Sequence, residues 1–129
     1  AGLIKLQSGC ILSHVPQNAR PEGDMRSFVQ HHGIDETLFK TILRKLNFSR
    51  EHFDHDLSQL SVGQQKKIML AMSLCQSAHL YLWDEPLNYI DVLSRIQIEH
   101  LLREFRPTMI LVEHDAAFIQ KTASRIIRL

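Results

Sequence analysis

The stretch LYLWDEPLNYID, residues 80–91, contains the features that decide the fold. Four large apolar residues lead directly into two adjacent carboxylates, Asp84 and Glu85, and Pro86 follows at once. A short apolar run bounded by turn residues predicts a strand buried in a sheet. The chain therefore places two charged groups at the carboxyl end of a buried strand.

Helices and strands are expected to alternate on both sides of this stretch. A helix is predicted over about 63–77, because QQKKIMLAMSLCQSA contains good helix formers and no breaker. Later elements are a helix from Asp91 to Phe105 with Ile96, Leu101 and Leu102 inward, a strand in TMILVE (108–113), a helix from Asp115 to Ala123 and a last strand in RIIRL (125–129). Strands buried on both faces and separated by helices predict an α/β fold with a parallel sheet and right-handed crossovers.

The first sixty residues carry weaker signals. GLIKLQ and GCILSHVPQ are interpreted as a hairpin or two short strands on either side of Ser8-Gly9. A short helix is expected from Asp24 to His32, ended by Gly33. Asp35 is the expected N-cap of a second helix with apolar residues at helical spacing: Leu38, Phe39, Ile42, Leu43 and Leu46. Residues 49–54 allow one more helical turn, and 55–60 are expected to form a linker.

Composition limits the class of protein. The chain has 129 residues, 44% of them hydrophobic and 22% charged, as in an ordinary soluble globular domain. No apolar run approaches the roughly 18 residues of a membrane-spanning helix, and the N-terminus lacks a signal-peptide pattern. The net charge of +1 gives no bulk attraction to nucleic acid. Cys10 and Cys75 favour reduced thiols, so we expect a cytoplasmic protein. The cluster HFDHD (52–56) is interpreted as a solvated loop rather than a metal site.

Acidic and imidazole side chains follow two strands of the expected sheet. Ligands of open parallel sheets bind at the carboxyl ends of strands, where Asp84 and Glu85 lie and where Glu113, His114 and Asp115 follow the next strand. Adjacent strand residues point to opposite faces, so Asp84 and Glu85 should have different roles. One can hold a divalent cation through water while the other orients or deprotonates a nucleophile. The residues alone also allow two surface acids where a strand leaves the sheet.

The segment LSVGQQKK, residues 60–67, offers a second kind of site. A serine and a glycine stand directly before the long helix, and free backbone N–H groups at a helix start bind anions. Ser61 followed three residues later by Gln64 is also an ordinary capping box. Either interpretation fits this segment taken alone.

Together these motifs resemble the ATP-binding-cassette (ABC) ATPases. LSVGQ is similar to the signature sequence of that family, with Val62 where glycine is usual, and LYLWDE is similar to its Walker B strand. NYID resembles the D-loop, His114 the switch histidine, and SHVPQ places Gln17 as the Q-loop glutamine. Five motifs in the order of the family cover nearly the whole chain, which makes the resemblance specific.

The resemblance implies a role for each matching residue toward ATP and Mg²⁺ in the intact protein. The catalytic residues would be Glu85, which polarises the attacking water, and His114, which contacts the γ-phosphate. Asp84 would hold Mg²⁺ through water, and Gln17 would reach both the metal and the attacking water. The nucleotide-binding residues would be Gln17, Ser61, Gly63, Gln64 and Asp91, of which Ser61 and Gly63 would contact ATP bound to an opposite cassette and Asp91 would line the interface.

One motif of the family is missing. No GxxxxGK[ST] phosphate loop occurs in the sequence, and the family has it before the Q-loop. We therefore expect a fragment of one nucleotide-binding domain that is inactive alone. Its expected parts are a Q-loop strand region (1–17), a helical subdomain (18–60) and a core with signature helix, Walker B strand, D-loop and switch histidine (61–129). Its expected partners are the rest of its own cassette and a second cassette.

The missing phosphate-loop strand has a further consequence for the sheet. In the family it lies between the strand that carries His114 and the final strand. We therefore expect GCILSHVP, HLYLW and TMILVE to form a contiguous parallel set in that spatial order, with the edge of TMILVE bare. Since an open apolar edge invites pairing, either RIIRL should move beside TMILVE or a second copy should cover the edge in a homodimer.

EPLNYID resembles the EPTNHLD of the ABC-F subfamily, whose members have two cassettes and no membrane domain. Asn88 is the main clue, whereas Leu87 and Tyr89 depart from the usual residues. The stretch AHLYLWDEPLNYID is most similar to the second cassette of ABC-F proteins that protect bacterial ribosomes from antibiotics. The resemblance therefore implies the ribosome as a partner. The alternatives are a transporter cassette and a non-catalytic docking module.

Overall fold

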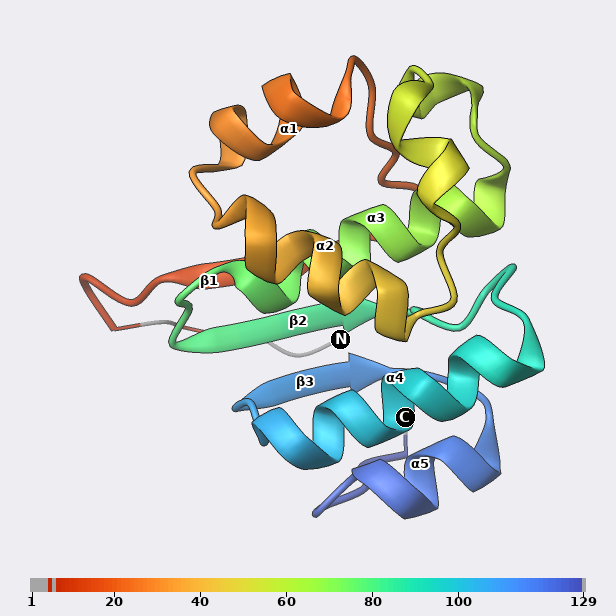
Figure 1. Ribbon diagram of the computed structural model, residues 1–129. Coiled ribbons are helices and arrows are strands. Elements are labelled where there is room, and N and C mark those ends of the chain that lie inside the picture. Colours follow the sequence, from red (N-terminus) through yellow and green to blue (C-terminus); the bar gives the residue numbers. More distant parts are fainter. Residues whose placement is uncertain (1–4, 6, 129) are drawn as a thin grey trace.

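The computed structural model describes residues 5 and 7–128 (Figure 1). Its strands are β1 (Leu12–Val15), β2 (Leu80–Asp84) and β3 (Met109–Val112). Its α-helices are α1 (Met25–His32), α2 (Glu36–Lys45), α3 (Val62–Cys75), α4 (Val92–Phe105) and α5 (Ala116–Thr122). Two short 3₁₀ helices, η1 (Arg50–Asp54) and η2 (Leu57–Gln59), lie between α2 and α3.

The described strands form one parallel sheet in the order β1-β2-β3. Val15 is in register with Trp83, and Trp83 with Leu111. The carboxyl ends of the strands therefore lie at the same edge, and the turns that follow them are brought side by side. This confirms the predicted α/β class, the parallel pairing and the spatial order of the strands.

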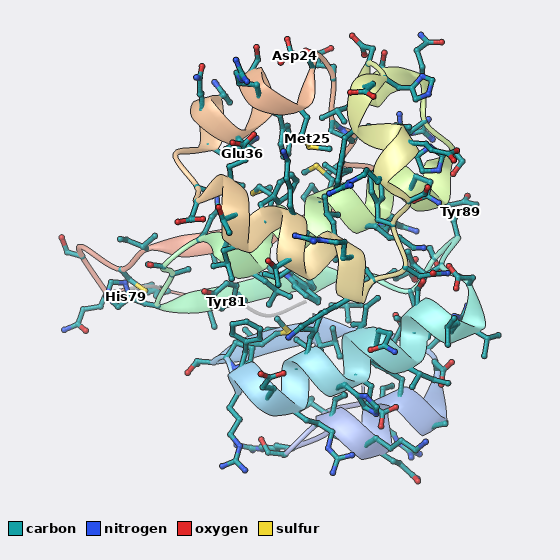
Figure 2. The ribbon with its side chains drawn as sticks, viewed as in Figure 1. Asp24, Met25, Glu36, His79, Tyr81 and Tyr89 are labelled. Carbon is teal, nitrogen blue, oxygen red and sulfur yellow. The ribbon has the colours of Figure 1, made fainter. Side chains whose placement is uncertain are left out.

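Helices cover the sheet from two sides. Figure 1 shows α2 and α3 along one side of the sheet, with α1 and the 3₁₀ helices above them, while α4 and α5 lie next to each other beside β3. In Figure 2, Met25 points from α1 into this upper part of the molecule, where it is buried, and Tyr89 projects from the turn after β2 into solvent. The helical residues between β1 and α3 thus form a lobe on top of α3.

Helix α3 is the centre of the structure. All residues from Gln65 to Leu74 are buried, including Lys66 and Lys67. Next to it, the indole of Trp83 on β2 is fully buried and donates a hydrogen bond to Ser73 Oγ at 2.9 Å. Ser73 Oγ lies 2.6 Å from Ser13 Oγ of β1. Apolar packing and this small polar network together fix β1 and β2 against α3.

The ends of the early helices follow the local signals in the sequence. Asp24 accepts a hydrogen bond from the Ser27 N–H, and Asp35 accepts one from the Leu38 N–H. Gly33 ends α1 in the left-handed conformation with φ of 60°. The predicted N-cap Asp35 and the predicted helix end at Gly33 are therefore confirmed, and α3 and α4 begin and end within two residues of their expected bounds.

Other local predictions were wrong. Residues 125–128 form no strand and pair with none of the described residues, because a strand forms only where a neighbour supplies hydrogen bonds. Residues 55–60 contain η2, whose Leu57 is fully buried, and are no simple linker. Ile96 is 43% exposed, since α4 turns Ile98 inward instead. The run GLIKLQ lies largely outside the described residues.

The sheet is also less covered than predicted. Along β3 the side chains alternate between partly buried and exposed, so this strand is not buried on both faces. Within the described part of the chain, β3 pairs only with β2, and its outer edge is open. RIIRL does not cover that edge, and pairing with a second copy of the chain stays a prediction.

Candidate functional site

The turns after the three strands converge on the carboxylate of Glu85. Gln17, two residues after β1, donates from Nε2 to Glu85 Oε2 at 2.5 Å. Asn88 Nδ2 donates to the same oxygen at 2.9 Å. His114, two residues after β3, places Nε2 at 2.9 Å from Glu85 Oε1. The structure thus brings together Gln17, Glu85 and His114, which lie up to about a hundred residues apart in the chain.

Glu85 lies just beyond its strand rather than inside it. Strand β2 ends at Asp84, and Glu85 has φ of 49°, in the left-handed region. Its N–H donates to the Val112 carbonyl of β3 at 2.7 Å. The expectation that Asp84 and Glu85 differ in direction by strand alternation is therefore corrected: a sharp backbone turn, held by β3, aims the Glu85 side chain.

Asp84 and Gln17 fit the expected role toward Mg²⁺. Within the described part of the chain, no side-chain hydrogen bond occupies the Asp84 carboxylate, and Gln17 uses its Nε2 but not its Oε1 toward Glu85. No group of three acidic, histidine or cysteine residues among the described ones can hold a metal by itself. Mg²⁺ commonly keeps several waters and takes only one or two protein oxygens beside phosphate oxygens, which suits this donor set.

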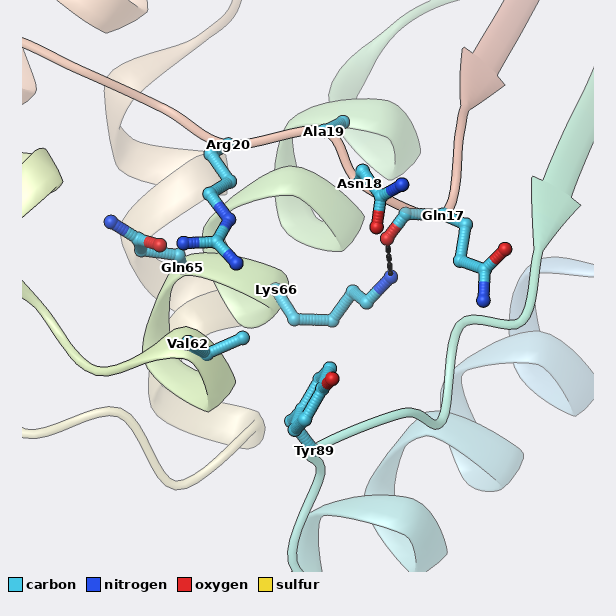
Figure 3. A pocket seen from close by; sticks show the side chains of 8 residues that line it. All are labelled: Gln17, Asn18, Ala19, Arg20, Val62, Gln65, Lys66 and Tyr89. Atoms are coloured by element: carbon cyan, nitrogen blue, oxygen red, sulfur yellow. Dashed lines mark hydrogen bonds between the residues drawn. The ribbon is translucent and has the colours of Figure 1, made fainter.

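A buried ammonium group stands behind these carboxylates. Lys66 of α3 is 4% exposed, and its Nζ donates to the Gln17 carbonyl at 3.2 Å. Burial lowers the pKa of Lys66, and the negative charges of Asp84, Glu85 and Glu113 oppose that shift. Figure 3 shows Lys66 reaching across a small cavity of about 40 Å³, with Tyr89 below it. Lys66 therefore links α3 to the turn after β1.

The N-terminus of α3 is capped as the sequence suggests. Ser61 Oγ accepts a hydrogen bond from the Gln64 N–H at 3.1 Å. The Gln64 side chain does not return a bond, because its buried Oε1 has no partner in the described part of the chain. Ser61 itself is exposed, so it can both cap the helix and face a ligand.

Ser61→Ala is expected to separate these two roles. Loss of the cap should lower the free energy of unfolding by about 1 kcal/mol. If Ser61 also contacts a γ-phosphate, ATPase activity of the intact protein should fall well beyond the change in melting temperature. Asp35→Ala is the matched control, since it removes an equivalent cap from α2 outside the site. Equal, small losses of activity in both variants would leave Ser61 with the capping role alone.

Gly63 has no room for a side chain. A Cβ atom at this position would lie 2.5 Å from the Tyr89 carbonyl oxygen, in the turn after β2. The backbone of α3 therefore packs directly against the segment that resembles the D-loop.

Asp91 joins the same segment to α3 and α4. Its carboxylate lies 3.0 Å from Lys67 Nζ and accepts a hydrogen bond from the Ser94 N–H at 2.9 Å. Partial burial raises the pKa of Asp91, but hydrogen bonds from Lys67 and Ser94 outweigh this effect and lower the pKa to about 2. The side chain is 48% exposed. Asp91 thus acts as an N-cap and as the partner of a buried lysine.

This depressed pKa predicts a pH-dependent stability. The carboxylate stabilises the fold above about pH 4, and this contribution is lost as the pH falls toward 2. After allowance for screening by solvent, Asp91→Asn should lower the free energy of unfolding by about 1 kcal/mol at pH 7. Urea titrations at pH 7 and pH 3 should show the difference from wild type shrinking at the lower pH. Asp54→Asn, at an exposed position, is the control, and a pH-independent difference for Asp91→Asn would contradict the argument.

Sequence reasoning missed three residues around the site: Lys66, Asn88 as a partner of Glu85, and Arg95. It placed Glu113 at the end of a strand but gave it no role. Glu113 accepts hydrogen bonds from the N–H groups of Leu87 and His114, at 3.3 and 2.8 Å. Arg95 contacts the turn after β2 and Asp115. The position of Asn88 three residues after Glu85, within one tight turn, was the only local signal for any of these contacts.

This chain is similar in sequence to known proteins. The sequence model of the family described as ABC transporter matches residues 6–88. ABC transporter F family member 2 of Arabidopsis thaliana is 31% identical over 68% of this chain, and the ribosome protection protein VmlR of Bacillus subtilis is 29% identical over 66% of it. The chain spans only 13% and 16% of these relatives.

Solved structures share the fold. The archaeal ribosome recycling factor aABCE1, in complex with the stalk protein aP1, has a TM-score of 0.73 over 94% of this chain and 25% of its own, at 24% identity. A cobalt transport ATP-binding protein has the same TM-score over 85% of this chain and 44% of its own, at 23% identity. The chain belongs to the ABC transporter family, and its similarity to ABC-F proteins fits part of an ABC-F nucleotide-binding domain.

Proposed function

We propose that the intact protein is an ABC-F ATPase that binds and hydrolyses ATP between two cassettes and acts on the ribosome. The observation that carries this proposal is the cluster around Glu85, in which the turns after all three described strands supply Gln17, Asn88 and His114. Glu85 adopts a left-handed backbone conformation to reach these side chains. Such strained conformations cost free energy and cluster at functional sites, which supports a catalytic role for this cluster.

Glu85 would orient and deprotonate the attacking water. Gln17 and Asn88 both donate to its Oε2, so this oxygen is held in place, while Oε1 faces His114. In this mechanism the water displaces the hydrogen bond of His114 to Oε1, and His114 turns to the γ-phosphate. Asp84 and the amide oxygen of Gln17 would hold Mg²⁺ through water, and Mg²⁺ would supply charge neutralisation at the phosphate oxygens.

The N-terminus of α3 would contact the ATP that is bound to the opposite cassette. Ser61, Gly63 and Gln64 lie at the N-terminus of a 14-residue helix, where backbone N–H groups and the helix dipole favour an anion. Asp91 would stand at the interface between cassettes. Tyr89, Val92 and Leu93, next to Asp91, are each more than half exposed, as expected for a surface that another domain covers.

The ribosome is proposed from the relatives. VmlR is a ribosome protection protein and aABCE1 a ribosome recycling factor, so two of the similar proteins act on ribosomes. A role in antibiotic resistance and a cytoplasmic location are the corresponding finer proposals. The described residues contain no helix that is long and apolar enough to span a membrane. The second candidate is a transporter cassette, favoured by the shared fold of the cobalt transport protein.

Cosedimentation of the intact protein with purified ribosomes tests this proposal. We expect the protein to pellet with ribosomes in the presence of Mg²⁺ and a non-hydrolysable ATP analogue, and to stay in the supernatant with ADP. Ribosomes should also stimulate its ATPase activity. ATP hydrolysis without any ribosome binding would favour the transporter cassette, and absence of ATP hydrolysis would favour a docking module.

A further inference from the structure

His114 depends on its backbone for its position. Its side chain is 83% exposed, and its contact with Glu85 is the one side-chain hydrogen bond it makes within the described residues. An exposed side chain has few packing contacts to fix it, so its position depends mainly on its backbone and on the hydrogen bonds that it makes. The location of the imidazole on Glu85 therefore depends on how the turn of residues 113–115 is held against the turn of residues 85–91.

Two side chains tie these turns together. Arg95 of α4 donates from Nε to the Ile90 carbonyl at 3.1 Å, from one terminal nitrogen to the Leu87 carbonyl at 3.4 Å, and from the other to Asp115 Oδ2 at 3.1 Å. From the opposite direction, Glu113 accepts from the Leu87 N–H through one oxygen and from the His114 and Asp115 N–H groups through the other. Figure 1 shows that both turns lie at the same end of the sheet, beside the starts of α4 and α5.

Asp115 makes the connection rigid on the side of β3. Its Oδ1 caps α5 by accepting from the Phe118 N–H at 3.0 Å, while its Oδ2 holds Arg95. A guanidinium suits this junction, since it is always charged and presents several donors in a fixed plane. Its five N–H donors in a fixed fork allow one side chain to reach two carbonyls and a carboxylate at once.

We infer that Arg95, together with Glu113, is a positioning residue that locks the turn after β2 to the turn after β3 and so fixes the backbone that places His114 beside Glu85. The inference rests on the proposed ATPase function for its effect on catalysis. Its structural content is independent of that function, because the lock joins parts of this chain alone.

The kinetic test uses the intact protein with Arg95→Met, which keeps the length of the side chain but removes its donors. The turnover of ATP should fall roughly 10- to 100-fold, as misplaced catalytic groups typically cost, with little change in KM. Arg95→Lys should be intermediate, because an ammonium cannot reach all three acceptors. Arg103→Met is the matched control: it lies on the same helix, is 63% exposed and, among the described residues, forms an ion pair with Glu99 alone, so turnover should change less than about twofold.

A double-mutant cycle with His114→Ala distinguishes positioning from a general structural role. If Arg95 acts through His114, Arg95→Met should lower turnover less than about twofold further in the His114→Ala protein. Multiplicative losses would overturn the inference, and so would wild-type turnover of Arg95→Met itself.

Amide hydrogen exchange gives a readout that needs no ATPase activity. Arg95→Met should speed exchange at Leu87, His114 and Asp115, whose N–H groups bond to Glu113, whereas Arg103→Met should not. Unchanged exchange at these amides would overturn the lock. A wild-type protein without ATPase activity but with the expected exchange pattern would refute the proposed function and leave the lock intact.

Discussion

Glu85→Gln is expected to lower ATP turnover in the intact protein by about 10²- to 10⁴-fold while ATP binding is retained. An amide has the same shape as the carboxylate. Its oxygen can still accept from Gln17 and Asn88, and its NH₂ group can donate to His114, so the cluster around residue 85 should persist. What the variant lacks is a base for the attacking water. The expected state is therefore two cassettes closed on bound ATP.

Steady-state turnover and ATP binding, measured on the same preparation, check this expectation. Glu104→Gln is the control, since this carboxylate is 67% exposed and only loosely paired with Lys45. The other cassette should carry a disabling change, so that its activity does not hide the loss. Wild-type turnover of Glu85→Gln in that background would refute the role assigned to Glu85.

Gly63→Ala is expected to have the second large effect. The new methyl group would lie 2.5 Å from the Tyr89 carbonyl oxygen, well inside van der Waals contact, so either α3 or the turn after β2 must move. Such overpacking typically costs about 1–3 kcal/mol of unfolding free energy. ATP turnover should fall as well, because the same turn carries Asn88 and Asp91. The restriction at this position is one of space and does not arise from the backbone angles of glycine.

Thermal unfolding and ATP turnover of the intact protein measure the two consequences of Gly63→Ala. Val62→Ala, at the adjacent exposed position, is the control for stability and should change the unfolding free energy by less than about 0.5 kcal/mol. A Gly63→Ala protein with the melting temperature and the turnover of wild type would contradict this prediction, because the turn after β2 would then move away from the new methyl group without cost.

Signals that act within a few residues were sufficient to predict much of the fold. Asp24, Gly33, Asp35 and Ser61 end or begin helices through hydrogen bonds and backbone angles that involve only near neighbours. The strand over 80–84 was likewise evident from its apolar run. The helix ends do not depend on what lies elsewhere in the chain, so the sequence predicts them well.

Features that depend on distant neighbours were not predictable in the same way. The β-branched residues Ile126 and Ile127 favour a strand, yet a strand needs a partner, and residues 125–128 have none among the described ones. Lys66 looks like a surface residue of a helix until the tertiary structure buries it. The residues placed by the family resemblance, Gln17, Glu85 and His114, do meet in space. Their support Arg95 matches no motif, and the sequence placed Glu113 at a strand end without indicating the N–H groups that it holds.

The burial of α3 on all sides also sets how freely the sequence can change. A helix with a solvent-facing stripe has positions where most substitutions are neutral, but residues 65–74 offer none. Random mutagenesis of the intact protein should therefore yield few functional variants in this helix, and those should conserve side-chain volume. Lys66 and Lys67 add a second restriction, because a change that removes either charge leaves a carbonyl or a carboxylate without its partner. Tolerance to mutation should be far higher in the exposed turns of the helical lobe, and that is where related sequences have freedom to diverge.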